Sequence, residues 1–216
     1  MLTDGSAGSG RRRLTAAAAV LLLILAVFSA SADTAEPGRK LTLMVYLCGS
    51  NLESEYGSAS ADLREMMAAQ ADPQKVSVLV MAGGSSFWRT GFDSRQTSIL
   101  EIGKMNSRQV WSGEAQDMGD PETLAGFLRF GTERYPAEDY ALILWNHGGG
   151  PLGGVCWDEL FSMDSMTLSE LTEALGEANL PRKLSWIGFD ACLMGSAEVA
   201  SAVSPYAEYM IASQEA

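Results

Sequence analysis

The chain has 216 residues, of which 47% are hydrophobic and 19% charged, an ordinary balance for one sizeable globular domain. Its formal net charge is −12, and beyond the N-terminus Lys and Arg do not cluster. Binding to nucleic-acid phosphates needs a basic surface, so these values argue against a nucleic-acid partner and favour cationic ones.

The N-terminal stretch "RRRLTAAAAVLLLILAVFSASA" has the pattern of a secretory signal peptide. Three arginines precede an apolar run over 14–28, and small residues end the stretch at Ala32. We therefore expect a signal peptide at 1–32, a short linker at 33–39, and a protein that is secreted or held in the cell envelope. The alternative is an uncleaved anchor, since the apolar run approaches the length that spans a bilayer. Membrane attachment is expected only in that case.

The next segment alternates strand and helix signals. The runs "KLTLMVYLCG" (40–49) and "KVSVLVMAGG" (75–84) are β-rich and end at glycine, and "ASADLREMMAAQA" (59–71) between them has apolar residues at helical spacing. The short runs at 97–105 and 108–113, separated by turn residues, predict a β-hairpin on the rim of the sheet.

The second half of the chain continues the alternation. Asp120 caps a predicted helix that ends near residues 135–139, and Thr167 with Glu170 forms a capping box for another helix. In chain order, the remaining predicted elements are a strand ending at "WNHGGG", the capped helix at 167–179, a strand at 183–192, a helix at 193–203 and a strand at 207–213. This order predicts the α/β class, with a mostly parallel sheet and helices on both faces.

The chain has three cysteines, Cys48, Cys156 and Cys192, and one histidine, His147. An odd number of cysteines leaves at least one thiol outside any internal disulfide. A single histidine argues against an ordinary Cys/His zinc site, so no metal ligands are predicted.

His147 and Cys192 each follow a predicted strand, and these two strands are consecutive. The carboxyl ends of parallel strands meet at one edge of the sheet, so the two side chains are expected to be neighbours. An imidazole beside a thiol can take its proton and make it a nucleophile. The main-chain N–H groups of Gly148 and Cys192 could then face a developing oxyanion, and Asp190 would suit a basic substrate side chain.

Each of these features also has a structural interpretation. Free cysteine is among the most buried residue types, and Cys48 and Cys156 are interpreted as core residues. The alternative for Cys156 is a mobile rim, because its neighbourhood is rich in glycine. His147 could be structural, and its glycines a simple turn. An esterase oxyanion loop also uses an HGGG segment but requires a G-x-S-x-G elbow, and the nearest string, "GGSSF", lacks the final glycine. A thiol-redox protein is disfavoured because no partner cysteine stands near Cys192 in the sequence.

Four ordered motifs resemble the clostripain family of cysteine peptidases, in the caspase-like group with legumain, gingipain and caspases. The motifs are "LMVYLCGSNLES", "LILWNHGGG", "FDACLMGSAEVA" and "YMIASQEA". The resemblance implies a caspase-like three-layer α/β sandwich over residues 40–216. It also implies an endopeptidase that cleaves protein or peptide substrates after Arg or Lys.

Position by position, the resemblance implies a role for each candidate residue. His147 matches the catalytic histidine, and Cys192 matches the nucleophile. The N–H groups of Gly148 and Cys192 match the oxyanion hole. Asp190 matches the acid that binds Arg or Lys. The chemistry requires no cofactor, although some family members need calcium, and some mature by cutting themselves after a basic residue.

Two departures from the family pattern bear on activity. The stretch from Gly148 to Pro181 has no Lys or Arg, which argues against self-cleavage there. The chain also stops at "ASQEA", where relatives continue with elements that complete the pocket, so the domain is expected to be truncated at its C-terminal end. An alternative function is therefore an inactive or regulatory peptide-binding module with the same fold.

Overall fold

The computed structural model of the protein describes residues 38–215. The predicted signal peptide at 1–32 and most of the predicted linker at 33–39 lie outside these residues. Within the described residues, no helix is both long and apolar enough to cross a membrane.

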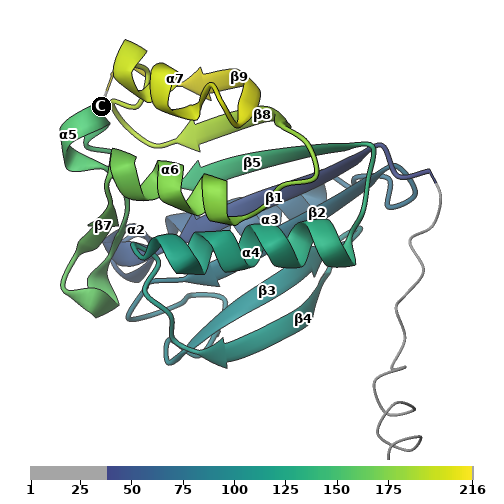
Figure 1. Cartoon of the computed structure of the whole chain (residues 1–216). Helices are drawn as coiled ribbons and strands as arrows, with labels where there is room; N and C mark the ends of the chain where they lie inside the picture. Colours follow the sequence, from purple (N-terminus) through teal and green to yellow (C-terminus); the bar gives the residue numbers. More distant parts are fainter. Residues whose placement is uncertain (1–37, 216) are drawn as a thin grey trace, which may run out of the picture. The chain divides into compact units, whose positions relative to one another are not determined.

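A seven-stranded sheet forms the centre of the described domain (Figure 1), in the order β4-β3-β2-β1-β5-β8-β9. Its parallel strands are β1 (Leu41–Cys48), β2 (Val76–Gly83), β5 (Asp139–Trp145), β8 (Leu184–Asp190) and β9 (Ala207–Ala212). The antiparallel strands β3 (Gln96–Ile102) and β4 (Ser107–Glu114) form the hairpin at one edge. The predicted mostly parallel sheet with a rim hairpin is confirmed.

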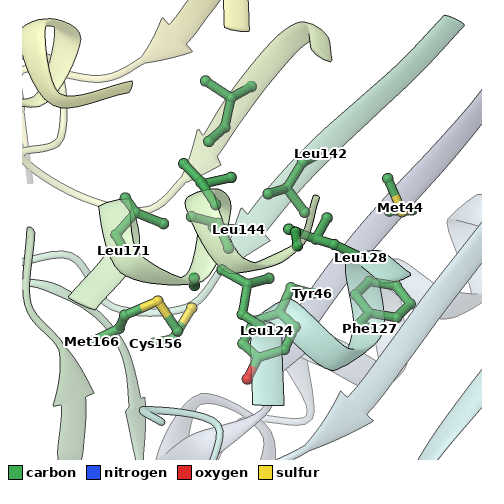
Figure 2. Packing of buried hydrophobic residues seen from close by; sticks show 14 of the residues in the cluster. Met44, Tyr46, Leu124, Phe127, Leu128, Leu142, Leu144, Cys156, Met166 and Leu171 are labelled. Carbon is green, nitrogen blue, oxygen red and sulfur yellow. The ribbon is translucent and has the colours of Figure 1, made fainter. Parts of the chain in front are cut away.

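Helices cover both faces of this sheet. The helix α3 (Ser58–Ala68) packs on one face, and the other carries α4 (Pro121–Arg134), α6 (Leu168–Glu177) and α7 (Ala197–Val203). Strand β1 shows why the two-sided packing arises: Met44 and Tyr46 join the core under α4, whereas Val45 and Leu47 join the core under α3. Figure 2 shows the first of these cores, where each large side chain contributes about 1.5–3 kcal/mol by burial.

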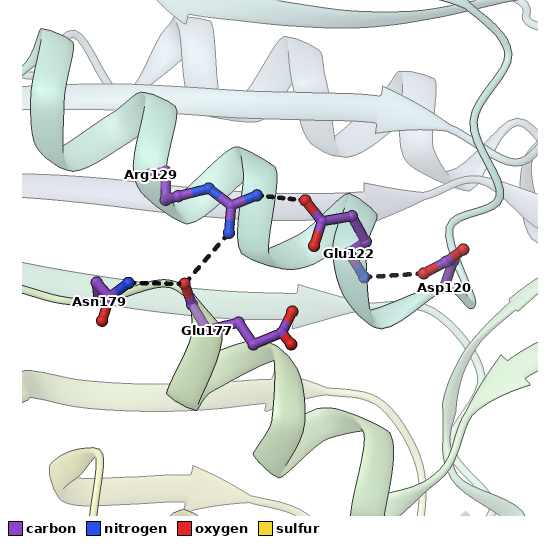
Figure 3. A network of polar contacts seen from close by, with 5 residues as sticks. All are labelled: Asp120, Glu122, Arg129, Glu177 and Asn179. Atoms are coloured by element: carbon purple, nitrogen blue, oxygen red, sulfur yellow. Dashed lines mark hydrogen bonds and ion pairs between the residues drawn. The ribbon is translucent and has the colours of Figure 1, made fainter.

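Capping interactions fix the beginnings and ends of the helices on the α4 face. The Asp120 carboxylate accepts a hydrogen bond from the Glu122 N–H at 2.8 Å, and the Thr167–Glu170 capping box is present, both as predicted. Figure 3 shows how Arg129 of α4 pairs with Glu122 and donates to the Glu177 carbonyl at the end of α6 at 3.2 Å. This contact ties the two neighbouring helices together.

Some elements were not predicted. They are the short helices α2 (Ser50–Ser54) and α5 (Gly150–Gly153), a 3-10 turn (Glu159–Phe161), and a hairpin of β6 (Val155–Asp158) and β7 (Asp164–Met166). The predicted helix at 193–203 is wrong in its first four residues. The φ angle of Leu193 is +63°, the Gly195 N–H donates to the Ser213 carbonyl at 2.7 Å, and the Ser196 hydroxyl caps the helix from outside. The helix therefore begins at Ala197.

Candidate active site

The register between β5 and β8 brings the two candidate reactive segments together. Trp145 lies opposite Asp190, and His147 and Cys192 each follow two residues later. The Asn146 N–H donates to the Asp190 carbonyl at 3.3 Å, which continues the pairing past the strand ends. At Gly148, a Cβ atom would collide with the Cys192 main chain and lie 3.1 Å from the Ala191 Cβ. The glycine therefore allows a contact that no other residue could make.

His147 is half-buried and is held from two sides. Its Nε2 lies 2.7 Å from the Asn51 Oδ1, and its ring centroid lies 6.2 Å from that of Trp157, with the planes tilted by 53°. An amide oxygen can only accept a hydrogen bond, so in this contact Nε2 is the donor, and Nδ1 is the ring nitrogen that the Asn51 contact does not use.

Asn51 was not predicted as a site residue. It belongs to α2, which follows the end of β1, and β1 is the neighbour of β5 in the sheet. A polar side chain just past the end of a central strand was the available signal, but the sequence does not say which strands are adjacent.

Asn146 fixes the position of the histidine segment. Its side chain is buried, and Nδ2 donates to the Cys48 carbonyl at 2.7 Å while Oδ1 accepts from the Trp157 N–H at 2.7 Å. The two bonds join the ends of β1 and β5 to the β6 strand, and a network satisfied in this way is rigid.

The three cysteines have different environments, and none forms a disulfide. Cys48 and Cys156 are fully buried, and burial raises the pKa of both thiols, so their prediction as core residues is confirmed. Cys192 alone is half-buried, at the carboxyl edge of the sheet. The Leu193 N–H donates to the Glu215 carbonyl at 3.2 Å, which holds the following turn.

The main-chain N–H groups of Gly148 and Cys192 have no acceptor within residues 38–215. An N–H group that is free in a folded segment can bind an incoming oxygen without losing another hydrogen bond. Since Gly148 packs directly on Cys192, the two donors belong to one small region of the surface.

A pocket of about 420 Å³ adjoins Cys192 and contains Asp190. Trp145 and Phe189 supply apolar walls, and Asp62 of α3 and Glu215 are two further acidic residues in the lining. Although Asp190 as a whole is exposed, partial burial of its carboxyl group raises its pKa, and the negative charge of Asp62 raises it further. A larger cavity, of about 550 Å³, lies between α4 and the β3–β4 hairpin, where neither His147 nor Cys192 lines it.

No three His, Cys, Asp or Glu side chains of the described residues converge as a metal site. The buried acid Asp158 uses its two oxygens for the N–H groups of Met118 and Leu160, at 2.9 and 2.8 Å. Both oxygens of this acid are therefore already used by the protein's own main chain.

Comparison with known proteins gives consistent matches. Residues 45–216 match the family model described as "Clostripain family". The chain is 28% identical over 205 residues to clostripain from Hathewaya histolytica, a match that covers 81% of this chain and 38% of clostripain.

Two solved structures have a similar fold. One is a secreted C11 cysteine protease from Bacteroides thetaiotaomicron bound to an irreversible peptide inhibitor (TM-score 0.65, 24% identity, 80% of this chain and 48% of that chain). The other is an inactive zymogen C11 protease from Parabacteroides distasonis (TM-score 0.61, 25% identity, 82% and 49%). These likenesses confirm the predicted caspase-like sandwich. The chain spans about half or less of the length of these relatives.

Proposed function

Because the chain belongs to the clostripain family, we propose that it is a cysteine endopeptidase whose nucleophile is Cys192 and whose general base and acid is His147. The observation that carries the proposal is the β5–β8 register, which sets both residues at one sheet edge with Gly148 packed on Cys192. Of the three thiols, only that of Cys192 is not fully buried.

The chemistry proceeds in two stages. The Cys192 thiol gives its proton to His147, and the thiolate forms a C–S bond with the scissile carbonyl carbon. The Gly148 and Cys192 N–H groups stabilise the oxyanion. The C–N bond then breaks as His147 returns the proton to the leaving amine, and water hydrolyses the thioester to a carboxylic acid and the free thiol.

Asn51 serves as a positioning residue in this scheme. Its Oδ1 holds the Nε2–H of His147 at 2.7 Å and also lies 3.5 Å from the Ser50 hydroxyl. The contact selects the tautomer in which Nδ1 exchanges the proton with Cys192.

The substrate class follows from Asp190. This carboxylate lines the pocket beside Cys192, and within the described residues it has no cationic or hydrogen-bonding partner of its own. Protein or peptide substrates with Arg or Lys before the scissile bond would supply the missing cation through a charge-assisted hydrogen bond.

Asp190→Asn tests this function, because it keeps the side-chain shape and removes the charge. The assay compares hydrolysis of an arginyl reporter peptide with that of a neutral one. We expect kcat/KM for the arginyl peptide to fall by about tenfold or more, equivalent to about 1.4 kcal/mol, and that for the neutral peptide to change little. An equal fall for both would make Asp190 structural. Peptide binding without any turnover would favour the regulatory peptide-binding module.

We also propose that the protein is exported. The N-terminal pattern is that of a cleaved signal peptide, and a similar protease from Bacteroides thetaiotaomicron is described as secreted. N-terminal sequencing of the exported protein should begin at Asp33. A sequence beginning at Met1 in the membrane fraction would instead support the anchor.

A further inference from the structure

Three acidic residues line the pocket beside Cys192: Asp62, Asp190 and, near the end of the described residues, Glu215. The first two come from different elements and share a second space. Asp190 ends β8, whereas Asp62 belongs to α3, more than a hundred residues earlier in the chain. Asp62 and Asp190 also line an adjoining hollow of about 250 Å³ along α3, and Trp145 lines both spaces. The two acids therefore face a common space.

Trp145 fixes this arrangement. It is 6% exposed, and its Nε1–H donates to the Asp62 Oδ2 at 2.7 Å. Trp145 also lies opposite Asp190 in the parallel β5–β8 register, so the two side chains project from the same face of the sheet. The indole thus holds the Asp62 carboxylate on the side of the sheet to which Asp190 points.

Three carboxylate oxygens of Asp62 and Asp190 remain without a donor from residues 38–215. Asp62 uses only Oδ2, and neither oxygen of Asp190 accepts a hydrogen bond or pairs with a cation. Partial burial raises the pKa of Asp190, and the negative charge of Asp62 raises it further. Two neighbouring acids without a cation between them produce a shift in this direction. The site is arranged for a ligand with several donors and a positive charge.

We infer that Asp62 is a second specificity-determining residue of this pocket, and that Asp62 and Asp190 together hold the guanidinium group of an arginine; this rests on the proposed function. A guanidinium presents five N–H donors in a planar fork and can serve two carboxylates at once. A lysine ammonium is a compact point charge and pairs best with one acid. Asp190 then selects for positive charge, and Asp62 selects arginine over lysine.

The test measures how fast Cys192 is alkylated by two peptidyl chloromethyl ketones that differ only in a terminal Arg or Lys. The full chain is used, with intact-mass detection, and three variants are compared: Asp62→Asn, Asp190→Asn and Asp139→Asn. Asp139 is a matched control because it is exposed at the opposite end of β5 and its side chain has no partner within the described residues. Iodoacetamide, which needs no pocket, reports the intrinsic reactivity of the thiol.

In wild type and in Asp139→Asn, we expect the arginyl probe to react faster than the lysyl probe. Asp62→Asn should slow the arginyl probe about tenfold and the lysyl probe less than about threefold, as expected when one of two charge-assisted bonds is lost. The iodoacetamide rate should not change. Asp190→Asn should slow both probes.

Two results overturn the inference. If Asp62→Asn leaves the Arg-to-Lys ratio at its wild-type value while Asp190→Asn slows both probes, Asp62 has no part in specificity and the proposed function stands. If neither probe reacts with wild-type Cys192 faster than with the buried thiols, the proposed function fails and the inference fails with it. Asn keeps an oxygen for the Trp145 N–H; should Asp62→Asn nevertheless fail to fold, Asp62→Ser replaces it in the same comparison.

Discussion

Replacing Gly148 by alanine should separate the two strand ends that carry His147 and Cys192. A Cβ at position 148 would lie 3.1 Å from both the Ala191 Cβ and the Cys192 carbonyl carbon, and closer still to the Cys192 oxygen. Carbon atoms pack at about 3.5–4.0 Å, so the carbons alone require a shift of about 0.5 Å and the oxygen increases it to about 1 Å. A misplacement of about 1 Å between reacting groups can slow a reaction about 100-fold. We expect a loss of that order.

The assay is the rate at which an arginyl chloromethyl ketone alkylates Cys192, together with the melting temperature. Gly126→Ala is the matched control, because a Cβ at this position in α4 meets only the Arg129 Nη2 at 3.9 Å. Alanine is also the better helix former by about 1 kcal/mol, so this variant should melt no lower than wild type and react at the wild-type rate.

If Gly148→Ala were alkylated at the wild-type rate and also melted at the wild-type temperature, the reasoning would be refuted, because the two segments would then have room for a side chain. A variant that is unfolded is recognised separately. In that case, the buried thiols of Cys48 and Cys156 would become reactive alongside Cys192.

Three further predictions concern side chains. Asn51→Ala should lower kcat for the arginyl peptide about tenfold with little change in KM, because it frees His147 to rotate. Asn51→Asp keeps an acceptor oxygen and should retain most of the rate. Equal losses in the two variants would show that the acceptor oxygen does not matter. In native protein, iodoacetamide should label Cys192 before Cys156, and peptide mapping that found the reverse would contradict the nucleophile assignment. Burial raises the pKa of Asp117 to about 6, so its contribution to stability is complete below about pH 4 and is lost as the pH rises to 6. In denaturant titrations, the free energy of unfolding of the wild type should therefore fall relative to that of Asp117→Asn over that range. Parallel pH profiles for the two proteins would contradict this prediction.

The strands and long helices were predictable because their signals are local. An apolar run that ends at glycine, as at Gly49 and Gly83, needs no knowledge of its neighbours to be recognised as a buried strand. The caps at Asp120 and Thr167 are equally local, since each depends on residues within one helical turn. His147 and Cys192 follow from the same information, because each stands directly after such a strand.

The supporting residues of the site depend on contacts that the sequence does not reveal. Asn51 contacts a side chain 96 positions later, and Asp62 one that is 83 positions later. Recognising either contact requires the order of β1, β5 and β8 in the sheet, which local patterns leave open. The start of α7 was misplaced for a related reason, since the bond from Gly195 to Ser213 competes with helix formation from outside the segment.

The same strand order explains why one sheet edge collects all the parts of the site. Strand β5 lies between β1 and β8, so the end of β1 supplies Asn51 to one side of His147 and the end of β8 supplies Cys192 to the other. A slip of one residue in the β5–β8 pairing would displace His147 by about 3.3 Å and turn alternate side chains to the opposite face. The slip would also remove Trp145 from its position beside Asp190, and with it the contact that holds Asp62. Burial of alternate residues of β5 in the two cores prevents that slip, so the packing that stabilises the fold also fixes the distances on which the chemistry depends.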